Sequence, residues 1–216
     1  VICRKEHFEQ TESMFADMIA SDRIKGVYVN QVDSMAYMKR HYPDKYLCGD
    51  INLYATNHIA IKEILQSVNR FTVSVELKAD ELKHLTLEQG ELMIYGRYPL
   101  MNTANCVFLT HGDCRRGKGE ALTYLKDRKG SSLPVIGYCE EAVCHNTVYN
   151  SVPTSLHKNA DVIRTMNLGG YQLRFVDEDV HMIKDILALY HDVFVTGTEH
   201  TVSFPFTNGH FKRGIE

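Results

Sequence analysis

The chain has 216 residues, 44% of them hydrophobic, which is enough for one ordinary globular domain with its own core. Its 24 Lys and Arg against 27 Asp and Glu give a formal net charge of −3, which excludes an overall basic field that would attract nucleic acid or an anionic membrane. The sequence has no run near the roughly 20 apolar residues that a membrane span needs, so we expect a cytoplasmic protein with no membrane partner.

Short apolar runs rich in β-branched and aromatic residues alternate with amphipathic stretches along the chain. The apolar runs predict buried strands at residues 26–30, 45–51, 70–77, 90–97 and 171–177. Apolar residues at helical spacing predict helices at 14–19, 59–65, 77–85, near Asp161 and at 178–191. Because strand and helix alternate, the sequence predicts an α/β fold of right-handed βα units whose strands lie parallel in one sheet.

This alternation stops after Pro99. Residues 100–153 are rich in Gly, Asn, Arg and Cys, with short possible strands at 133–138 and 146–150. A structureless loop of this length is improbable in a compact domain, so we expect the segment to be ordered by a small sheet of its own or by a metal. The chain therefore divides into βα units at 1–99, a cysteine-bearing insertion at 100–153, and a final βα unit with an extended tail at 154–216.

Polar residues follow several of the predicted strands. In parallel α/β proteins the loops after the strands meet at one edge of the sheet and carry function. This rule selects the following residues: Asn30, Asp50, Asn52, Glu76, Arg97 and Arg174. Such side chains would suit a polar or anionic substrate, but Glu76 could equally form a structural ion pair with Arg97 or Arg174.

Four cysteines, Cys106, Cys114, Cys139 and Cys144, fall within 39 residues. In a reducing compartment such clustering points first to metal or redox chemistry. The group lacks the CxxC pairs of structural zinc sites, although His111 and His145 lie beside two of the cysteines. An iron–sulfur cluster, zinc and unliganded thiols all remain open from the spacing. Cys48, inside a predicted strand, is expected to be a core thiol.

A basic stretch lies between the second and third of these cysteines. It holds Arg115, Arg116, Lys118, Lys126, Arg128 and Lys129, and the tail adds Lys212 and Arg213. Such a patch could hold RNA phosphates. An ordinary solvated face is the favoured interpretation, because no aromatic residues for base stacking run alongside the charges. Hydrolytic motifs are absent: the sequence has neither a GxSxG elbow nor an HExxH pair.

Several segments in the same order along the chain resemble one known family. GELMIYGRYPLMNTANC (90–106) is similar to the signature of the collagenase-like peptidase family (peptidase family U-thirty-two), in which a strand ending in Gly leads through a loop to a cysteine. The similarity continues through GDINLYATNHIAI, VSVELKADEL, LKDRKGSSLPV, CHNTVYNS and TNGHFKRGIE. This collinear series covers nearly the whole chain and is more specific than any single motif.

The resemblance implies the later part of a (β/α) barrel. The strands that open the family's barrel are not found before Val1, so we expect a missing N-terminal barrel part, or a second subunit, as a partner. The family name implies proteolysis of undefined catalytic type. Other relatives resemble RNA-base or quinone-precursor hydroxylases that use a [4Fe–4S] cluster held by four cysteines.

By position in the family pattern, Cys106, Cys114 and Cys144 match cluster cysteines, and Cys139 would replace a fourth that the family has where this chain reads Tyr98-Pro99. We therefore expect a peptidase-family enzyme acting on a peptide, with an iron–sulfur RNA hydroxylase or a non-catalytic scaffolding fragment as the alternatives. The expected site residues are Asn52, Glu76, Arg97 and Arg174, with the four cysteines as ligands of a [4Fe–4S] cluster, or of zinc, or of neither.

Overall fold

The computed structural model describes residues 16–139, 144–198 and 201–214. They form two compact units, each described by itself below. The α/β unit contains Ala20–Gly96, Thr154–Arg174 and the described residues after Val180, and the antiparallel unit contains Arg97–Pro153 and Phe175–Asp179.

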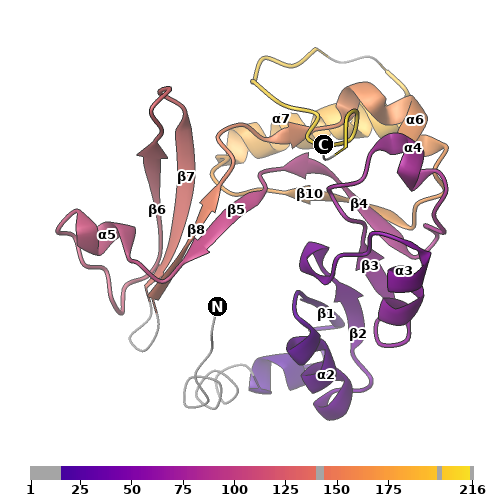
Figure 1. Cartoon of the computed structure of the whole chain (residues 1–216), viewed down its shortest axis with the longest axis horizontal. Coiled ribbons are helices and arrows are strands. Elements are labelled where there is room, and N and C mark those ends of the chain that lie inside the picture. The colour runs from indigo at the N-terminus through magenta and orange to yellow at the C-terminus, as the bar shows by residue number, and fades with distance from the viewer. Residues whose placement is uncertain (1–15, 140–143, 199–200, 215–216) are drawn as a thin grey trace. The chain divides into compact units, whose positions relative to one another are not determined.

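A curled parallel sheet forms the centre of the α/β unit (Figure 1). Its order is β1-β2-β3-β4-β10, and every neighbouring pair along this path is parallel. The strands are β1 (Gly26–Val29), β2 (Tyr46–Gly49), β3 (Arg70–Thr72), β4 (Gly90–Gly96) and β10 (Gly170–Arg174). All five predicted strands and their parallel order are confirmed. The described sheet is a half-barrel, since a closed barrel of this kind has about eight parallel strands.

Helices connect the strands of this sheet in the expected alternation. They are α2 (Val32–His41), α3 (His58–Leu65), α4 (Ala79–Leu82), α6 (Ala160–Arg164) and α7 (Val180–His191), with short 3-10 turns η1 (Ile51–Leu53) and η2 (His157–Asn159). A π-helix, η3 (Asp192–Thr196), continues α7. The sequence did not predict α2, and the reason is that only Met38 of this helix is buried, which leaves no apolar stripe to detect.

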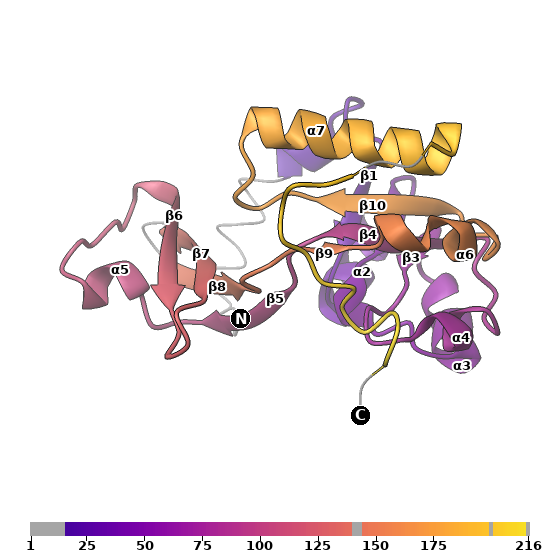
Figure 2. The ribbon, with the colours of Figure 1, turned by 90° about the horizontal axis from the view of Figure 1, so that it is seen from above.

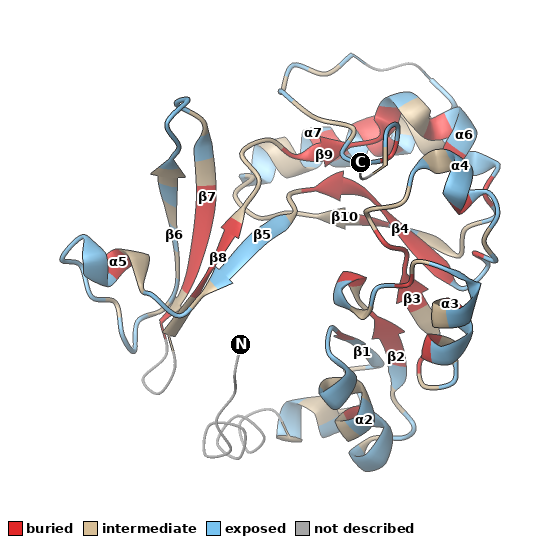
Figure 3. Ribbon diagram, viewed as in Figure 1, coloured by how far each residue is buried: buried red, intermediate tan, exposed pale blue. Residues whose placement is uncertain are grey.

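One face of the sheet is apolar and lies against helices. Phe71 on β3 is in register with Gly49 on β2 and with Gly90 on β4, so these three positions share a face. A Cβ atom added at Gly49 would lie 2.8 Å from Leu53 Cδ1 and 3.5 Å from Ile64 Cγ2 of α3, which shows how closely this helix packs. Figure 3 shows the central strands as buried and the outer surfaces of α2 and α3 as largely exposed.

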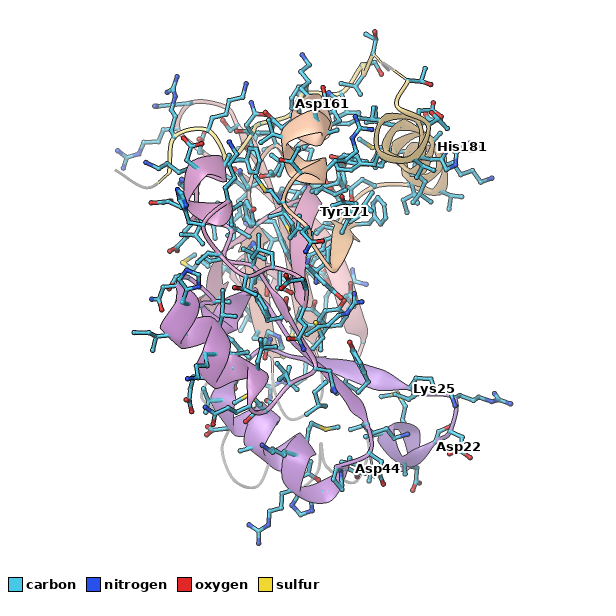
Figure 4. The ribbon with its side chains drawn as sticks, turned by 90° about the vertical axis from the view of Figure 1, so that its right-hand side faces the viewer. Asp22, Lys25, Asp44, Asp161, Tyr171 and His181 are labelled. Atoms are coloured by element: carbon cyan, nitrogen blue, oxygen red, sulfur yellow. The ribbon has the colours of Figure 1, made fainter. Side chains whose placement is uncertain are left out.

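The last helix runs beside the last strand of the sheet. Figures 1 and 2 both show α7 alongside β10. The ring of Tyr171 on β10 lies 4.9 Å from that of Phe194, just beyond α7, and Figure 4 shows Tyr171 below the helix that carries His181. A two-residue strand, β9 (Thr154–Ser155), pairs antiparallel with β4.

The C-terminal tail is bound to the same unit by backbone hydrogen bonds. Ser155 N donates to Thr207 O over 2.9 Å, and Ala79 N donates to Phe211 O over 2.8 Å. Phe211 is buried. The tail therefore belongs to the core of the α/β unit instead of extending away from it. Within the part of the chain that the structure describes, no helix has the length and apolarity to span a bilayer.

The antiparallel unit holds a four-stranded sheet in the order β5-β8-β7-β6. Its elements are β5 (Pro99–Thr103), α5 (Val107–Thr110), β6 (Gly119–Lys126), β7 (Ser132–Cys139) and β8 (Cys144–Tyr149). The two short strands predicted in this segment correspond to β7 and β8. The segment thus has a sheet of its own, which is one of the two ways of ordering it that the sequence allowed.

Candidate functional site

Polar side chains from all five parallel strands share the face of the sheet opposite to Phe71. Tyr28, Cys48 and Arg70 are in register across β1, β2 and β3, and Thr72 is in register with Glu91. Alternation along each strand places them on one side. We call this side the polar face, and it consists of Tyr28, Cys48, Asp50, Arg70, Thr72, Glu91, Gln172 and Arg174.

Glu91 stands at the centre of the polar face. Its Oε2 accepts hydrogen bonds from Tyr28 Oη over 2.6 Å and from Gln172 Nε2 over 2.8 Å. Its Oε1 lies 3.4 Å from Arg70 Nη1. The Glu91 side chain is only 12% exposed, so these three donors replace the water that its carboxylate has lost.

The contacts of Glu91 decide its protonation. Burial by itself raises the pKa of this carboxyl, but the hydrogen bonds from Tyr28, Gln172 and Arg70 outweigh burial and hold the pKa below its ordinary value. Burial and the bond to Glu91 raise the pKa of Tyr28. Burial, followed by the negative charge of Glu91, raises the pKa of Cys48 to about 12. At neutral pH the site thus holds an ionised Glu91, a protonated phenol and a protonated thiol.

A second set of contacts continues the network towards the ends of the strands. Gln172 Nε2 also donates to Thr72 Oγ1 over 2.8 Å, while Gln172 Oε1 accepts from Arg174 Nη2 over 2.9 Å. The guanidinium of Arg174 forms an ion pair with Asp50, whose Oδ1 also caps η1 by accepting from Ile51 N over 2.8 Å. The polar face is therefore one connected network from Tyr28 to Asp50.

Parts of this network are accessible to solvent. The side chain of Arg70 is 37% exposed and that of Arg174 is 29% exposed, while Tyr28 is 57% exposed. Fixed cationic and hydroxyl donors are thus accessible beside two carboxylates. Such an arrangement can bind a polar or anionic group by exchanging water for charge-assisted hydrogen bonds.

The four predicted site residues have different surroundings. Arg174, the last residue of β10, belongs to the polar face. Asn52 is exposed within η1. Glu76 lies in the turn after β3, where its carboxylate has no hydrogen bond or ion pair with a described residue. Arg97 lies in the antiparallel unit. Each arginine has another carboxylate partner within its own unit, Asp177 for Arg97 and Asp50 for Arg174.

Arg97 instead joins three segments within the antiparallel unit. Its Nε lies 2.6 Å from Asp177 Oδ1, and its Nη1 donates to the carbonyl oxygens of Asn150 and Ser151 over 3.0 and 2.6 Å. The Arg97 and Asp177 side chains are 11% and 9% exposed. Because every contact is internal and buried, this ion pair has a structural role.

Sequence reasoning missed most of the polar face. Tyr28, Glu91 and Gln172 lie inside strands, whereas the search was confined to strand ends. Glu91 gives the clearest signal, since it is a polar residue in an otherwise apolar run and has buried neighbours on both sides. Polar residues inside predicted strands are therefore candidates for such a site.

The four clustered cysteines lie in the antiparallel unit. Cys139 and Cys144 face each other across β7 and β8, and Cys106 caps α5, its Sγ accepting from Leu109 N over 3.4 Å. Burial raises the pKa of Cys139, and the neighbouring Cys106 and Cys144 raise it further. Cys114 is exposed. The described residues include no group of three His, Cys, Asp or Glu side chains arranged to hold a metal ion.

Comparisons with known proteins give no family. No protein-family model matches the sequence, and no curated protein gives a significant match. Among solved structures, the chain is similar to the C-terminal domain of a predicted chitinase from Desulfitobacterium hafniense DCB-2, with a TM-score of 0.39 and 13% identity over 88% of this chain and 74% of that one.

Two further solved structures show a similarity of the same order. A chitinase from Chromobacterium violaceum ATCC 12472 has a TM-score of 0.35 and 11% identity, over 86% of this chain and 72% of that one. The spore cortex-lytic enzyme SleL of Bacillus megaterium QM B1551 has a TM-score of 0.36 and 11% identity, over 86% of this chain and 53% of that one. At these TM-scores the similarities support no conclusion about activity.

Proposed function

We propose that this chain is part of an enzyme of the collagenase-like peptidase family, and that its polar face binds the substrate. The observation that carries the proposal is the network from Tyr28 to Asp50, to which all five parallel strands contribute. A parallel sheet normally packs apolar side chains on both faces. Replacing paired charges in a sheet by apolar side chains is often neutral or stabilising, so the two ion pairs on this face support a binding role.

The substrate that suits this face is polar and carries a negative group. Arg70 and Arg174 are the accessible cations, and each is already oriented by a carboxylate, Glu91 or Asp50. A carboxylate of a peptide or a phosphate of RNA could accept hydrogen bonds from either guanidinium without rearranging the sheet. Tyr28 adds an aromatic surface at the edge strand.

A peptidase also needs a nucleophile or an activated water. Cys48 does not serve as a nucleophile on the polar face, because its raised pKa keeps it protonated at neutral pH. The lowered pKa of Glu91 makes its carboxylate a weak base. The polar face is therefore assigned to substrate binding, and the groups that cleave a peptide bond would come from outside this face, for example from a second subunit.

A second candidate function, iron–sulfur-dependent hydroxylation of an RNA base, is favoured by one observation. Cys139 and Cys144 face each other across β7 and β8, and Cys106 belongs to the same unit. A cluster would require these described side chains to rearrange, since they are not arranged to hold a metal ion. Thiolates are the usual ligands of a [4Fe–4S] cluster and common ligands of zinc. A bound cluster would supply electron transfer, and Cys114, on the exposed segment before β6, is the remaining thiolate of the set.

The test compares both activities in protein purified without oxygen. Hydrolysis of gelatin, casein and collagen peptides and hydroxylation of RNA are measured for the wild type, Arg174→Gln and Glu91→Gln, with Arg23→Gln and Glu63→Gln as controls on exposed residues of the same unit. We expect the Michaelis constant of the active substrate to rise at least about tenfold in the first two variants, as charge-assisted bonds predict, and to stay unchanged in the controls. Unchanged constants in all four variants would remove the polar face from the site.

Metal content distinguishes the two functions. An absorption band near 400 nm with about four iron atoms per chain, lost in Cys139→Ser but kept in Cys48→Ser, would support the hydroxylase. Proteolysis without iron, or with zinc alone, would support the peptidase. Absence of both activities in the complete protein, in the presence of its partner, would leave a scaffolding role.

A further inference from the structure

A cavity of about 580 Å³ lies in the α/β unit outside the polar face. Its lining comes from η2, α6, the π-helix η3 and the segment that follows it, and it shares no residue with the polar face. Cavities that bind small molecules have volumes of roughly 300–1,000 Å³. This cavity is therefore large enough for a metabolite-sized ligand.

Basic side chains outnumber acidic ones among the described residues that line the cavity. His157, Lys158 and Arg164 line it, together with the hydroxyls of Thr198 and Thr201. Asp161 is the acidic residue among them, and its side chain is 93% exposed. Asp161 pairs with Arg164, which leaves Lys158 as the cation of the lining without a carboxylate partner among the described residues. Figure 4 labels Asp161 on α6.

The cations are held in place by neighbouring groups. Arg164 pairs with Asp161 and donates from Nη1 to Val193 O of the π-helix over 3.3 Å. Lys158 Nζ lies 5.3 Å from the centre of the Phe206 ring, which orients its ammonium group without neutralising it. Ordered donors lose less conformational entropy on binding than free surface chains do.

A chain of hydrogen bonds holds the imidazole of His157 in place. His157 is 4% exposed, and its Nδ1 lies 2.8 Å from Ser155 Oγ, which in turn lies 2.8 Å from Tyr190 Oη. Tyr190 Oη donates to Ile94 O on β4 over 2.6 Å. This chain of contacts ties the wall of the cavity to the central strand. The π-helix ends at Gly197, whose φ is 74° and which also lines the cavity, and π-helices frequently occur at functional sites.

We propose that this cavity binds a small ligand through an oxyanion, a phosphate or a carboxylate, held by Lys158 and Arg164. The guanidinium and ammonium would donate to the oxyanion, and the threonine hydroxyls would complete its hydrogen bonds. The proposal is independent of the function proposed for the polar face, because the two places have no residue in common.

Isothermal titration calorimetry at constant ionic strength tests the proposal on the whole chain. The probes are inorganic phosphate and succinate, with sodium chloride as the blank. The variants are Lys158→Gln and Arg164→Gln, and the matched control is Lys184→Gln, an exposed lysine on α7. We expect saturable binding of at least one probe, about tenfold weaker in each cavity variant and unchanged in the control. The probe that binds more tightly identifies the oxyanion.

Three outcomes would overturn the proposal: no saturable binding of either probe, equal weakening in the control, or full affinity in Lys158→Gln. Arg164→Gln also loses its contacts with Asp161 and Val193, so its thermal midpoint is compared with that of the wild type. If this variant unfolds, Lys158→Gln decides the question, since Lys158 is exposed and makes no buried hydrogen bond. Lys158→Arg keeps the positive charge. If it restores binding, the weaker binding of Lys158→Gln results from the lost charge and not from a structural change.

Discussion

Glu91 illustrates how a single residue determines the chemistry of the polar face. Its carboxylate is nearly buried, yet the donors around it favour the ionised form. Burial raises the pKa of Tyr28 and of Cys48, and the neighbouring Glu91 raises both further. One ion therefore adds to the effect of burial on two neighbours.

The lowered pKa of Glu91 predicts a pH-dependent contribution to stability. A carboxyl with a depressed folded-state pKa stabilises the fold above its unfolded pKa of about 4.3, and this stabilisation is lost as the pH falls through the folded-state value. We expect Glu91→Gln to lower the free energy of unfolding by about 1–2 kcal/mol at pH 7 and by progressively less below pH 4. Urea denaturation between pH 3 and 8, with Glu63→Gln as control, measures this, and a pH-independent difference would contradict it.

Thiol reactivity tests the protonation of Cys48. Alkylation requires the thiolate. Cys48 is buried, and burial raises its pKa to about 12, whereas Cys114 is exposed. We expect iodoacetamide at pH 8 to modify Cys114 at least about a hundredfold faster than Cys48, as quantified by peptide mass spectrometry. Denatured protein, in which both should react alike, is the control. Equal rates in the native protein would show that Cys48 is accessible and ionised.

At the scale of elements, glycines allow helices to approach strands closely. In the antiparallel unit, a Cβ atom at Gly137 of β7 would lie 2.4 Å from Phe108 Cε2 of α5. Phe108 is buried. The docking of this four-residue helix on its sheet therefore depends on the absence of a side chain at one position.

A double-mutant cycle tests this packing. We expect Gly137→Ala to destabilise the protein by about 1–3 kcal/mol, because an inserted methyl group overpacks a filled site. In a Phe108→Ala background the same substitution should cost much less, because the ring that it meets is gone. Thermal or urea unfolding of the four proteins supplies the coupling energy. If Gly137→Ala lowers the free energy of unfolding equally in both backgrounds, the added methyl group does not clash with the Phe108 ring.

At the scale of the whole molecule, the described parallel sheet ends at two edge strands, β1 and β10, instead of closing. Tyr28 on β1 and Tyr46 on β2 are 57% and 45% exposed. An edge strand with unpaired backbone groups and exposed aromatic side chains favours pairing with another chain.

This edge predicts self-association when the chain is studied alone. We expect sedimentation velocity to show a mean mass that rises with concentration between about 1 and 100 μM, the range of weak interfaces. A monomer at all concentrations would contradict the prediction.

The sequence alone was sufficient for the α/β class, the five parallel strands and most of their helices, because runs such as 70–77 and 90–97 carry strong local signals of burial. The sequence could not predict which side chains of the polar face bond to one another. Glu91 bonds to Tyr28 and Gln172, which lie 63 and 81 positions away. Arg174 bonds to Asp50, which lies 124 positions away. Strand register decides these contacts, and register depends on the packing of the whole sheet, which no local pattern encodes. For the same reason Arg97, alike in sequence position to Arg174, became a structural ion pair in the antiparallel unit, while Arg174 joined the polar face.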